Sequence, residues 1–249
     1  MHFEAGVGHI GGNLSALDVL LHLHANVMGT EDLFVLSKGH GAGALYIALW
    51  SVGRINDAEL QSFHKDGTHL GGHPVAGWHD GITFATGSLG HGLGLAAGAA
   101  MARRLDGKGG RIFCLLSDGE CEEGSIWEAL IFAHHQRLSN LVVLVDANGL
   151  QGFGSTGAVA SLEPLLPRFA GFGLNVVEID GHCSKALDAA LARPCDGPSV
   201  IVLRTIKGRG VSFMEGRMEW HYLPLNERQY RQALEELAEP ELADAEPGA

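Results

Sequence analysis

Short apolar runs alternate with amphipathic segments along most of the chain. The runs at 112–116 and 141–145 have the continuous apolar character of strands that are buried on both faces. The segments between the runs carry apolar residues at helical spacing. This alternation predicts an α/β fold, a mostly parallel sheet with helices on both faces. The predicted strands are 82–86, 111–116, 141–145, 175–179 and 199–206, and the predicted helices are 15–28, 41–52, 56–65, 93–105, 122–137, 162–169, 184–193 and 226–237.

Two of the predicted helices carry start signals. Ser15 followed by Asp18 has the spacing of a capping box, and Asn56 is a favourable residue immediately before a helix. The segments 68–80 and 149–160 are predicted to be loops. Since no internal repeat or long linker interrupts the pattern, we expect one domain over 1–225 and a C-terminal helix with an acidic, frayed tail over 226–249.

Composition and charge narrow the functional classes. The net charge of −12 argues against a nucleic-acid surface, and the absence of a run of about 18 apolar residues argues against a membrane span. The N-terminus carries no basic stretch leading into an apolar one, so no secretory signal is expected. The four cysteines lack metal-binding spacing, which predicts free thiols in a reducing compartment, hence a cytoplasmic protein.

Glycine-rich polar segments follow several predicted strands. They occupy 86–90, 117–120, 146–149 and 207–210. Ligands of open parallel sheets bind at the carboxyl ends of the strands, so we expect the functional site to be built from these segments.

Asp118 and Asn148 each follow a buried apolar run, and one helix separates the two runs. If the two strands are neighbours, both side chains point into the same crevice. A carboxylate and an amide oxygen form a plausible partial shell for Mg²⁺, which favours diphosphate oxygens as its further ligands. Asp-Gly and Asn-Gly are also common turn sequences, so a purely structural role stays open here.

A dinucleotide site is the rival interpretation of the same region. The segment 92–97 fits the pattern G-x-G-x-x-A, follows a predicted strand and opens a helix. Asp118 would then end the next strand, where a ribose-binding acid belongs. The match is short, and its small residues can equally serve close helix packing.

The chain has 36 glycines and 14 histidines, and several histidines are flanked by glycine. Glycine lets a ligand approach the backbone, and histidine donates to phosphate or moves protons near neutral pH. The candidate site histidines are His9, His40, His73 and His221. We assign a structural or surface role to His22, His24, His134 and His135.

Five motifs, taken in order, carry a family resemblance. They are Gly8-His9-Ile10-Gly11-Gly12, Lys38-Gly39-His40-Gly41, Gly72-His73-Pro74, Thr86-Gly87-Ser88-Leu89-Gly90, and Ser117-Asp118-Gly119-Glu120 with Asn148. Together they resemble the N-terminal, diphosphate-binding half of transketolases, and most closely the stand-alone N-terminal subunits of split transketolases. The resemblance runs from His9 to about Leu225 and implies a thiamine-diphosphate-binding fold.

The resemblance implies a set of cofactor ligands. Asp118, Asn148 and the carbonyl of Leu150 would hold Mg²⁺ or Ca²⁺, and Gly119 would bring its backbone to the diphosphate. The segment made of Gly87, Ser88 and Leu89 would touch thiamine diphosphate.

The resemblance also implies roles for the histidines. His40 and His221 would lie beside the cofactor, and His9 and His73 would reach the hydroxyls of the sugar. His9, His73 and His221 would be the catalytic residues. Glu123 would couple paired active sites across a dimer interface.

On this basis the glycines of the dinucleotide pattern, Gly92 and Gly94, only permit tight helix packing. Ser117 departs from the family, which usually has glycine there, so a side chain stands beside the diphosphate. It can be accommodated if its φ is negative.

The implied reaction is ketol transfer between ketose and aldose phosphates. A chain of 249 residues leaves no room for the pyrimidine-binding domain. We therefore expect a partner subunit that carries the pyrimidine-binding and C-terminal domains, together with self-association of this chain. The alternatives are a subunit like deoxyxylulose-phosphate synthase and a non-catalytic thiamine-diphosphate-binding subunit.

Overall fold

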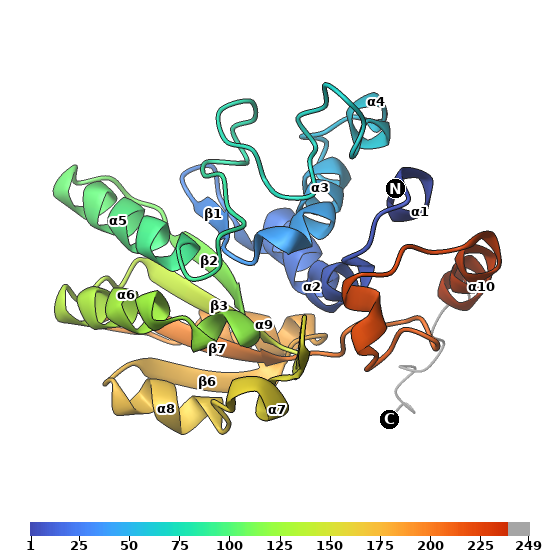
Figure 1. Cartoon of the computed structure of the whole chain (residues 1–249). Coiled ribbons are helices and arrows are strands. Elements are labelled where there is room, and N and C mark those ends of the chain that lie inside the picture. The colour runs from blue at the N-terminus through green and yellow to red at the C-terminus, as the bar shows by residue number, and fades with distance from the viewer. Residues whose placement is uncertain (239–249) are drawn as a thin grey trace, which may run out of the picture.

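A five-stranded parallel sheet forms the centre of the protein (Figure 1). The computed structural model describes residues 1–238. The strand order is β1-β2-β3-β7-β6, and every neighbouring pair is parallel. The strands are β1 (Leu33–Leu36), β2 (Ile112–Ser117), β3 (Leu141–Ala147), β6 (Asn175–Asp180) and β7 (Ser199–Arg204), and a separate antiparallel hairpin is formed by β4 (Leu150–Gln151) and β5 (Gly154–Ser155).

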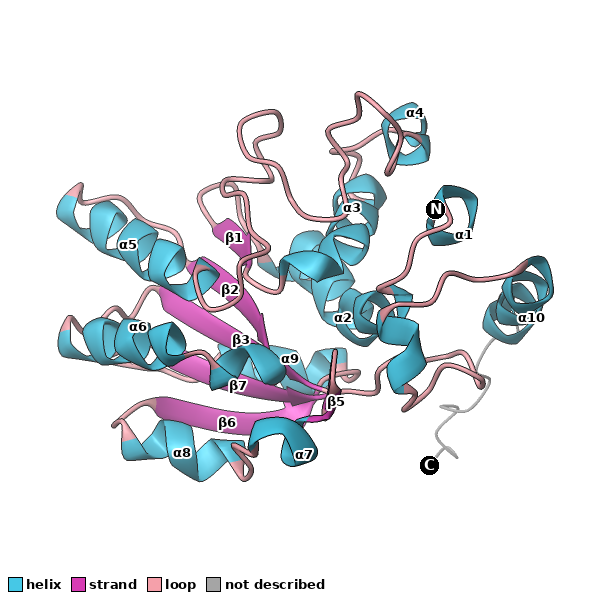
Figure 2. Cartoon of the chain, in the orientation of Figure 1, coloured by secondary structure: helices cyan, strands magenta, loops and turns pink. Residues whose placement is uncertain are grey.

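Helices cover both faces of the sheet, as the sequence predicts (Figure 2). Helices α2, α3 and α9 pack on one face, and α5, α6 and α8 pack on the other. The helices are α1 (His2–Ala5), α2 (Ile10–His22), α3 (Ala42–Ser51), α4 (Asp57–Gln61), α5 (Gly92–Leu105), α6 (Gly124–His135), α7 (Thr156–Ala160), α8 (Leu165–Gly171), α9 (Ser184–Leu191) and α10 (Glu227–Ala238).

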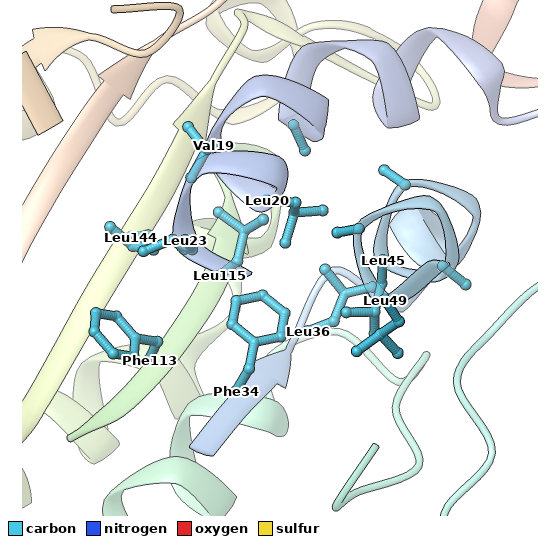
Figure 3. Close-up of a cluster of buried hydrophobic side chains, with 14 of the residues drawn as sticks. Val19, Leu20, Leu23, Phe34, Leu36, Leu45, Leu49, Phe113, Leu115 and Leu144 are labelled. Atoms are coloured by element: carbon cyan, nitrogen blue, oxygen red, sulfur yellow. The ribbon is translucent and has the colours of Figure 1, made fainter. Parts of the chain in front are cut away.

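Alternate residues of the central strands fill the two cores. Phe113 and Leu115 of β2 point to the face covered by α2 and α3, and Figure 3 shows them in one cluster with Leu20 and Leu45. The alternate residues of the same strand, Ile112, Cys114 and Leu116, join the opposite core, under α5 and α6. Burial on both sides explains why these strands are apolar without interruption.

The predicted strand at 82–86 is wrong: the segment has no strand partner. Ile82 belongs to the core beneath α3, whereas Phe84 packs against the core beneath α5. The segment therefore passes from one face of the sheet to the other, and its apolar residues serve packing. The edge strand is instead β1, a run of only four residues that was not among the predicted strands.

The predicted start of the first long helix is also wrong. Helix α2 begins at Ile10, five residues before the expected Ser15, and its N-cap is His9. Ser15 is buried inside the helix, where its hydroxyl donates to Asp146 at 2.7 Å. It therefore joins the interior of the protein, and the predicted capping box with Asp18 does not form.

The remaining predicted elements are present but differ from the structure in their bounds or content. Asn56 caps α4 through a capping box with Glu59, although the helix ends at Gln61. The predicted loop 149–160 contains the β4–β5 hairpin and α7. The tail over 239–249, which we expected to be frayed, lies outside the described residues. Within 1–238 no helix is both long and apolar enough to cross a membrane.

Candidate functional site

The predicted site residues gather at the carboxyl ends of β1, β2, β3 and β7, beside the start of α2. A cavity of about 170 Å³ lies there, lined among others by His40, Leu89, Ser117, Gly119, Asn148, Leu150, Lys207, His221 and Tyr222. A larger open groove of about 490 Å³ at the ends of β6 and β7 contains none of the predicted site residues.

Asp118 and Asn148 come from neighbouring strands, as expected. Ser117 pairs with Asp146 in the sheet, so the residues that follow each strand lie side by side. The carboxylate of Asp118 accepts the N–H of Gly119 at 2.8 Å and that of Gly149 at 2.6 Å. The amide oxygen of Asn148 accepts the N–H of Leu150 at 3.1 Å.

The electrostatics of this pair favour a cation. Burial, followed by repulsion from Asp146, raises the pKa of Asp118 to about 6. A divalent cation beside this carboxylate would offset both effects, so the donor set fits Mg²⁺. Within 1–238 no cluster of three or more His, Cys, Asp or Glu side chains could hold a metal ion. The donor set at the ends of β2 and β3 instead combines one carboxylate, one amide and one carbonyl.

Lys207 lies beside the carbonyl that the resemblance makes the third metal ligand. Its ammonium donates to the Leu150 carbonyl at 3.4 Å and lies 3.0 Å from Nδ1 of His221. Burial lowers the pKa of Lys207 to about 8. The glycine-rich segment that contains Lys207 stands out in the sequence, but no role was predicted for the lysine. A lysine inside a glycine-rich segment that follows a strand is the signal that could have identified it.

A second lysine is buried beneath the cavity. Lys38 forms an ion pair with Asp146, and each side chain is 1% exposed. The Lys38 ammonium also donates to the Gly12 carbonyl at 2.9 Å. Burial alone would raise the pKa of Asp146, but Lys38 and the hydroxyls of Ser15 and Thr205 lower it. This network ties α2, β1, β3 and the end of β7 into one rigid floor.

The four candidate histidines lie close together, and two of them, His40 and His221, line the cavity. The ring centroid of His9 lies 5.7 Å from that of His40, 6.2 Å from His73 and 5.2 Å from His221. The centroids of His40 and His221 are 5.5 Å apart. Burial lowers the pKa of each of the four, to about 3 for His221. All four imidazoles are therefore neutral at pH 7, and each can donate through one nitrogen and accept through the other.

His9 is held in an unusual backbone conformation. Its φ of 65° is left-handed, which few residues other than glycine adopt, and it is the N-cap of α2. Its N–H donates to the carbonyl of His221 at 3.1 Å. The start of α2 and the segment after β7 therefore place these two imidazoles together.

The segment from Gly87 to Leu89 packs tightly against the residues after β1. A Cβ on Gly39 would lie 2.7 Å from the backbone nitrogen of Gly87, so only glycine fits there. Leu89 lines the cavity, whereas Ser88 lines an outer groove against α5. The buried carboxylate of Glu120 holds this segment by accepting the N–H of Gly90 at 2.9 Å.

Ser117 is accommodated without strain. It ends β2 and is not among the residues with positive φ. Its hydroxyl accepts the N–H of Glu120 at 3.2 Å, which caps the turn that follows the strand. The side chain is thus satisfied locally, while Ser117 still lines the cavity.

The two glycines of the dinucleotide pattern differ. A Cβ on Gly92 would lie 2.3 Å from the hydroxyl oxygen of Ser37, so close packing requires glycine at this position. A Cβ on Gly94 would meet no atom of another part of the described chain within 4 Å, so the predicted packing role is wrong for that residue. Glu123, the predicted coupling acid, is exposed and is the N-cap of α6.

Comparisons with known proteins identify relatives of the chain. A family profile described as "Transketolase, thiamine diphosphate binding domain" matches residues 4–241. The chain is 40% identical to the 6-deoxy-6-sulfo-D-fructose transketolase subunit of a Clostridium species, covering 94% of this chain and 90% of that protein. It is 36% identical to an apulose-4-phosphate transketolase subunit of Actinobacillus succinogenes, covering 92% of this chain and 87% of that protein.

The fold is similar to that of solved transketolases. The transketolase of Leishmania mexicana superimposes with a TM-score of 0.86 and 28% sequence identity. The match covers 94% of this chain but only 38% of the Leishmania protein. The chain therefore spans well under half the length of that single-chain enzyme, whereas it spans most of the Clostridium and Actinobacillus proteins.

Proposed function

Since the chain belongs to the transketolase family and matches its thiamine diphosphate binding domain, we propose that it is the diphosphate-binding subunit of a two-chain transketolase. The assembled enzyme transfers a two-carbon ketol unit between ketose and aldose phosphates. The observation that carries the proposal is a cavity lined by Asn148, His40 and His221, with Asp118 at the neighbouring strand end and the rings of His9 and His73 packed beside these histidines. Similarity to transketolase subunits supports this reaction over that of deoxyxylulose-phosphate synthase.

The cofactor would be anchored at the ends of β2 and β3. Asp118, Asn148 and the Leu150 carbonyl would hold Mg²⁺ against the diphosphate, and the N–H of Gly119 would face the same group. Lys207 would turn from the Leu150 carbonyl towards the phosphate oxygens when the metal binds. Thiamine diphosphate supplies the nucleophilic carbon, and the protein supplies orientation and proton transfer.

The histidines would divide the remaining work. His40 and His221 line the cavity and would contact the cofactor. His9 and His73 would contact the hydroxyls of the donor sugar. Because their imidazoles are neutral at pH 7, these groups can both accept and return a proton during transfer.

A partner subunit would complete the site. The cofactor's aminopyrimidine needs a base held by a pyrimidine-binding domain, and the family match of this chain is to the thiamine diphosphate binding domain of transketolase. A groove of about 500 Å³ lined by Ala85, Thr86, Ser88, His91, Gly94 and Leu95 lies beside the predicted cofactor segment. The groove is mostly apolar and Leu95 is 39% exposed, which suits a protein contact. We assign this face to the partner, with two copies of each chain in the assembly.

The proposal is tested by calorimetric titration of thiamine diphosphate with Mg²⁺. The chain should bind the cofactor, and Asp118→Ala should abolish the Mg²⁺-dependent part of that binding because it removes the charged ligand. Asp180→Ala is the matched control, since Asp180 also lies at the carboxyl end of a strand, but that strand is β6, which carries none of the proposed ligands. Purified alone, the chain should show no ketol transfer; transfer without a partner, or full cofactor affinity in Asp118→Ala, would contradict the proposal.

A further inference from the structure

Tyr222 spans the rim of the cavity between two glycines. On one side its carbonyl oxygen lies 2.2 Å from the position that a Cβ on Gly8 would occupy. On the other side its hydroxyl oxygen lies 2.4 Å from the position of a Cβ on Gly152. Gly8 precedes His9, and Gly152 belongs to the β4–β5 turn. The residue therefore connects the histidine side of the site with the hairpin that carries the Leu150 carbonyl.

The position of the ring is fixed from several directions. Tyr222 follows a short 3₁₀ turn, and its N–H donates to the carbonyl of Glu219 at 3.0 Å. Its ring meets the imidazole of His221 edge-on, with centroids 4.7 Å apart. The hydroxyl end already contacts Gly152, so the ring has no room to swing further towards the hairpin.

The ring nevertheless borders the open side of the cavity. Tyr222 lines the cavity and is 54% exposed, so one side of the ring contacts protein and the other is open. Phe153, at the tip of the hairpin, also lines the cavity and is 86% exposed. Two aromatic side chains thus border the opening above the groups assigned to the cofactor.

We propose that Tyr222 is a specificity-determining residue, whose ring limits the width of the sugar that can reach the cofactor between His221 and the β4–β5 hairpin. This rests on the proposed function. A rigid wall next to the reacting end discriminates by shape, because a substituent that overlaps the ring must displace a side chain with no space behind it. Unbranched ketose phosphates pass the wall, and branched ones are disfavoured.

The test compares two donors in the complex of this chain with its pyrimidine-binding partner. Fructose 6-phosphate is the unbranched probe, and apulose 4-phosphate is the branched one. In Tyr222→Ala the ratio of kcat/KM for the branched over the unbranched donor should rise at least fivefold, mainly through KM. Tyr222→Phe keeps the ring, so the ratio should stay within twofold of wild type.

Gly152→Ala moves the ring without removing it. Its φ is not left-handed, and beyond the Tyr222 hydroxyl the added methyl meets only ordinary contacts of 3.4 Å or more. The methyl would push the hydroxyl end away from the hairpin and towards the open side of the ring, so this variant should lower the ratio, opposite to Tyr222→Ala. Leu223→Ala is the control, since Leu223 is 48% exposed and lies outside the cavity lining.

The outcomes separate the two proposals. Cofactor affinity, measured by titration, should change less than threefold in every Tyr222 variant. An unchanged or lower donor ratio in Tyr222→Ala would overturn the role of Tyr222 even if the complex is active. A tenfold loss of cofactor affinity with an unchanged ratio would place the ring on the cofactor instead. Absence of transfer by the wild-type complex would overturn the proposed function, and the role of Tyr222 with it.

Discussion

The buried ion pair between Lys38 and Asp146 offers the sharpest test of how the floor of the site is held. Lys38→Met removes the ammonium and leaves a carboxylate in the interior. Removing one partner of a buried pair costs about 3–5 kcal/mol. Asp146 keeps the hydroxyls of Ser15 and Thr205 as donors, so we expect the lower value, about 3 kcal/mol.

Substituting the acidic partner of the pair should cost more stability. Among the described residues, Asp146 is the only carboxylate paired with the Lys38 ammonium. In Asp146→Ala the buried ammonium keeps only the neutral Gly12 carbonyl as a partner, so we expect the free energy of unfolding to fall by about 5 kcal/mol. The double variant Lys38→Met with Asp146→Ala removes both charges. It should be more stable than Asp146→Ala, since neither charge remains buried alone.

Urea unfolding of the purified chain, followed by circular dichroism, gives the three free energies. A loss below about 1 kcal/mol for Lys38→Met would show that water reaches the pair and that the floor is not sealed. Strict additivity of the two single losses in the double variant would also refute the reasoning, because groups in direct contact should couple.

Two further predictions concern histidines. In the assembled enzyme, His9→Ala and His73→Ala should lower kcat by about 10²–10⁴-fold with little change in cofactor affinity, whereas His40→Ala should chiefly weaken cofactor binding; equal losses of affinity in all three, by titration, would contradict this division. Burial, followed by repulsion from Arg54, lowers the pKa of His24 from 6.5 to about 4, so its contribution to stability is present above pH 6.5 and is lost as the pH falls towards 4. In the wild type the unfolding free energy should fall as the pH is lowered from 6.5 to 4, and His24→Leu should make this fall smaller by up to about 3 kcal/mol. An unchanged pH dependence would rule out His24 as the source of the fall.

The central strands and the histidine cluster were predictable because their signals are local. β2, β3 and β7 are buried on both faces, so their sequences are continuously apolar and easy to recognise. The start of α2 was not predictable, since Gly11 and Gly12 have low helix propensity. A Cβ on Gly11 would lie 3.1 Å from the side chain of Trp220, so tertiary packing sets the composition of this first turn.

The partners of the two site lysines could not be predicted, for a related reason. Lys38 meets Asp146 across 108 positions of sequence, and Lys207 meets the Leu150 carbonyl across 57. A single sequence gives no sign of such pairings, whereas Asp118 and Asn148 follow strands separated by one helix. Residues that depend on neighbouring strand ends could be predicted, and those that depend on distant partners required the fold.

The two cores on opposite faces of the sheet have a consequence for how activity is controlled. Both faces are already covered by helices of this same chain, so folding does not wait for a partner. Assembly of the proposed enzyme is then an ordinary binding equilibrium between two folded proteins, governed by mass action. Specific activity should fall on dilution below the dissociation constant and recover when either chain is added back. The amount of the scarcer chain would therefore set the flux, which gives a cell a means of control that a single-chain enzyme lacks.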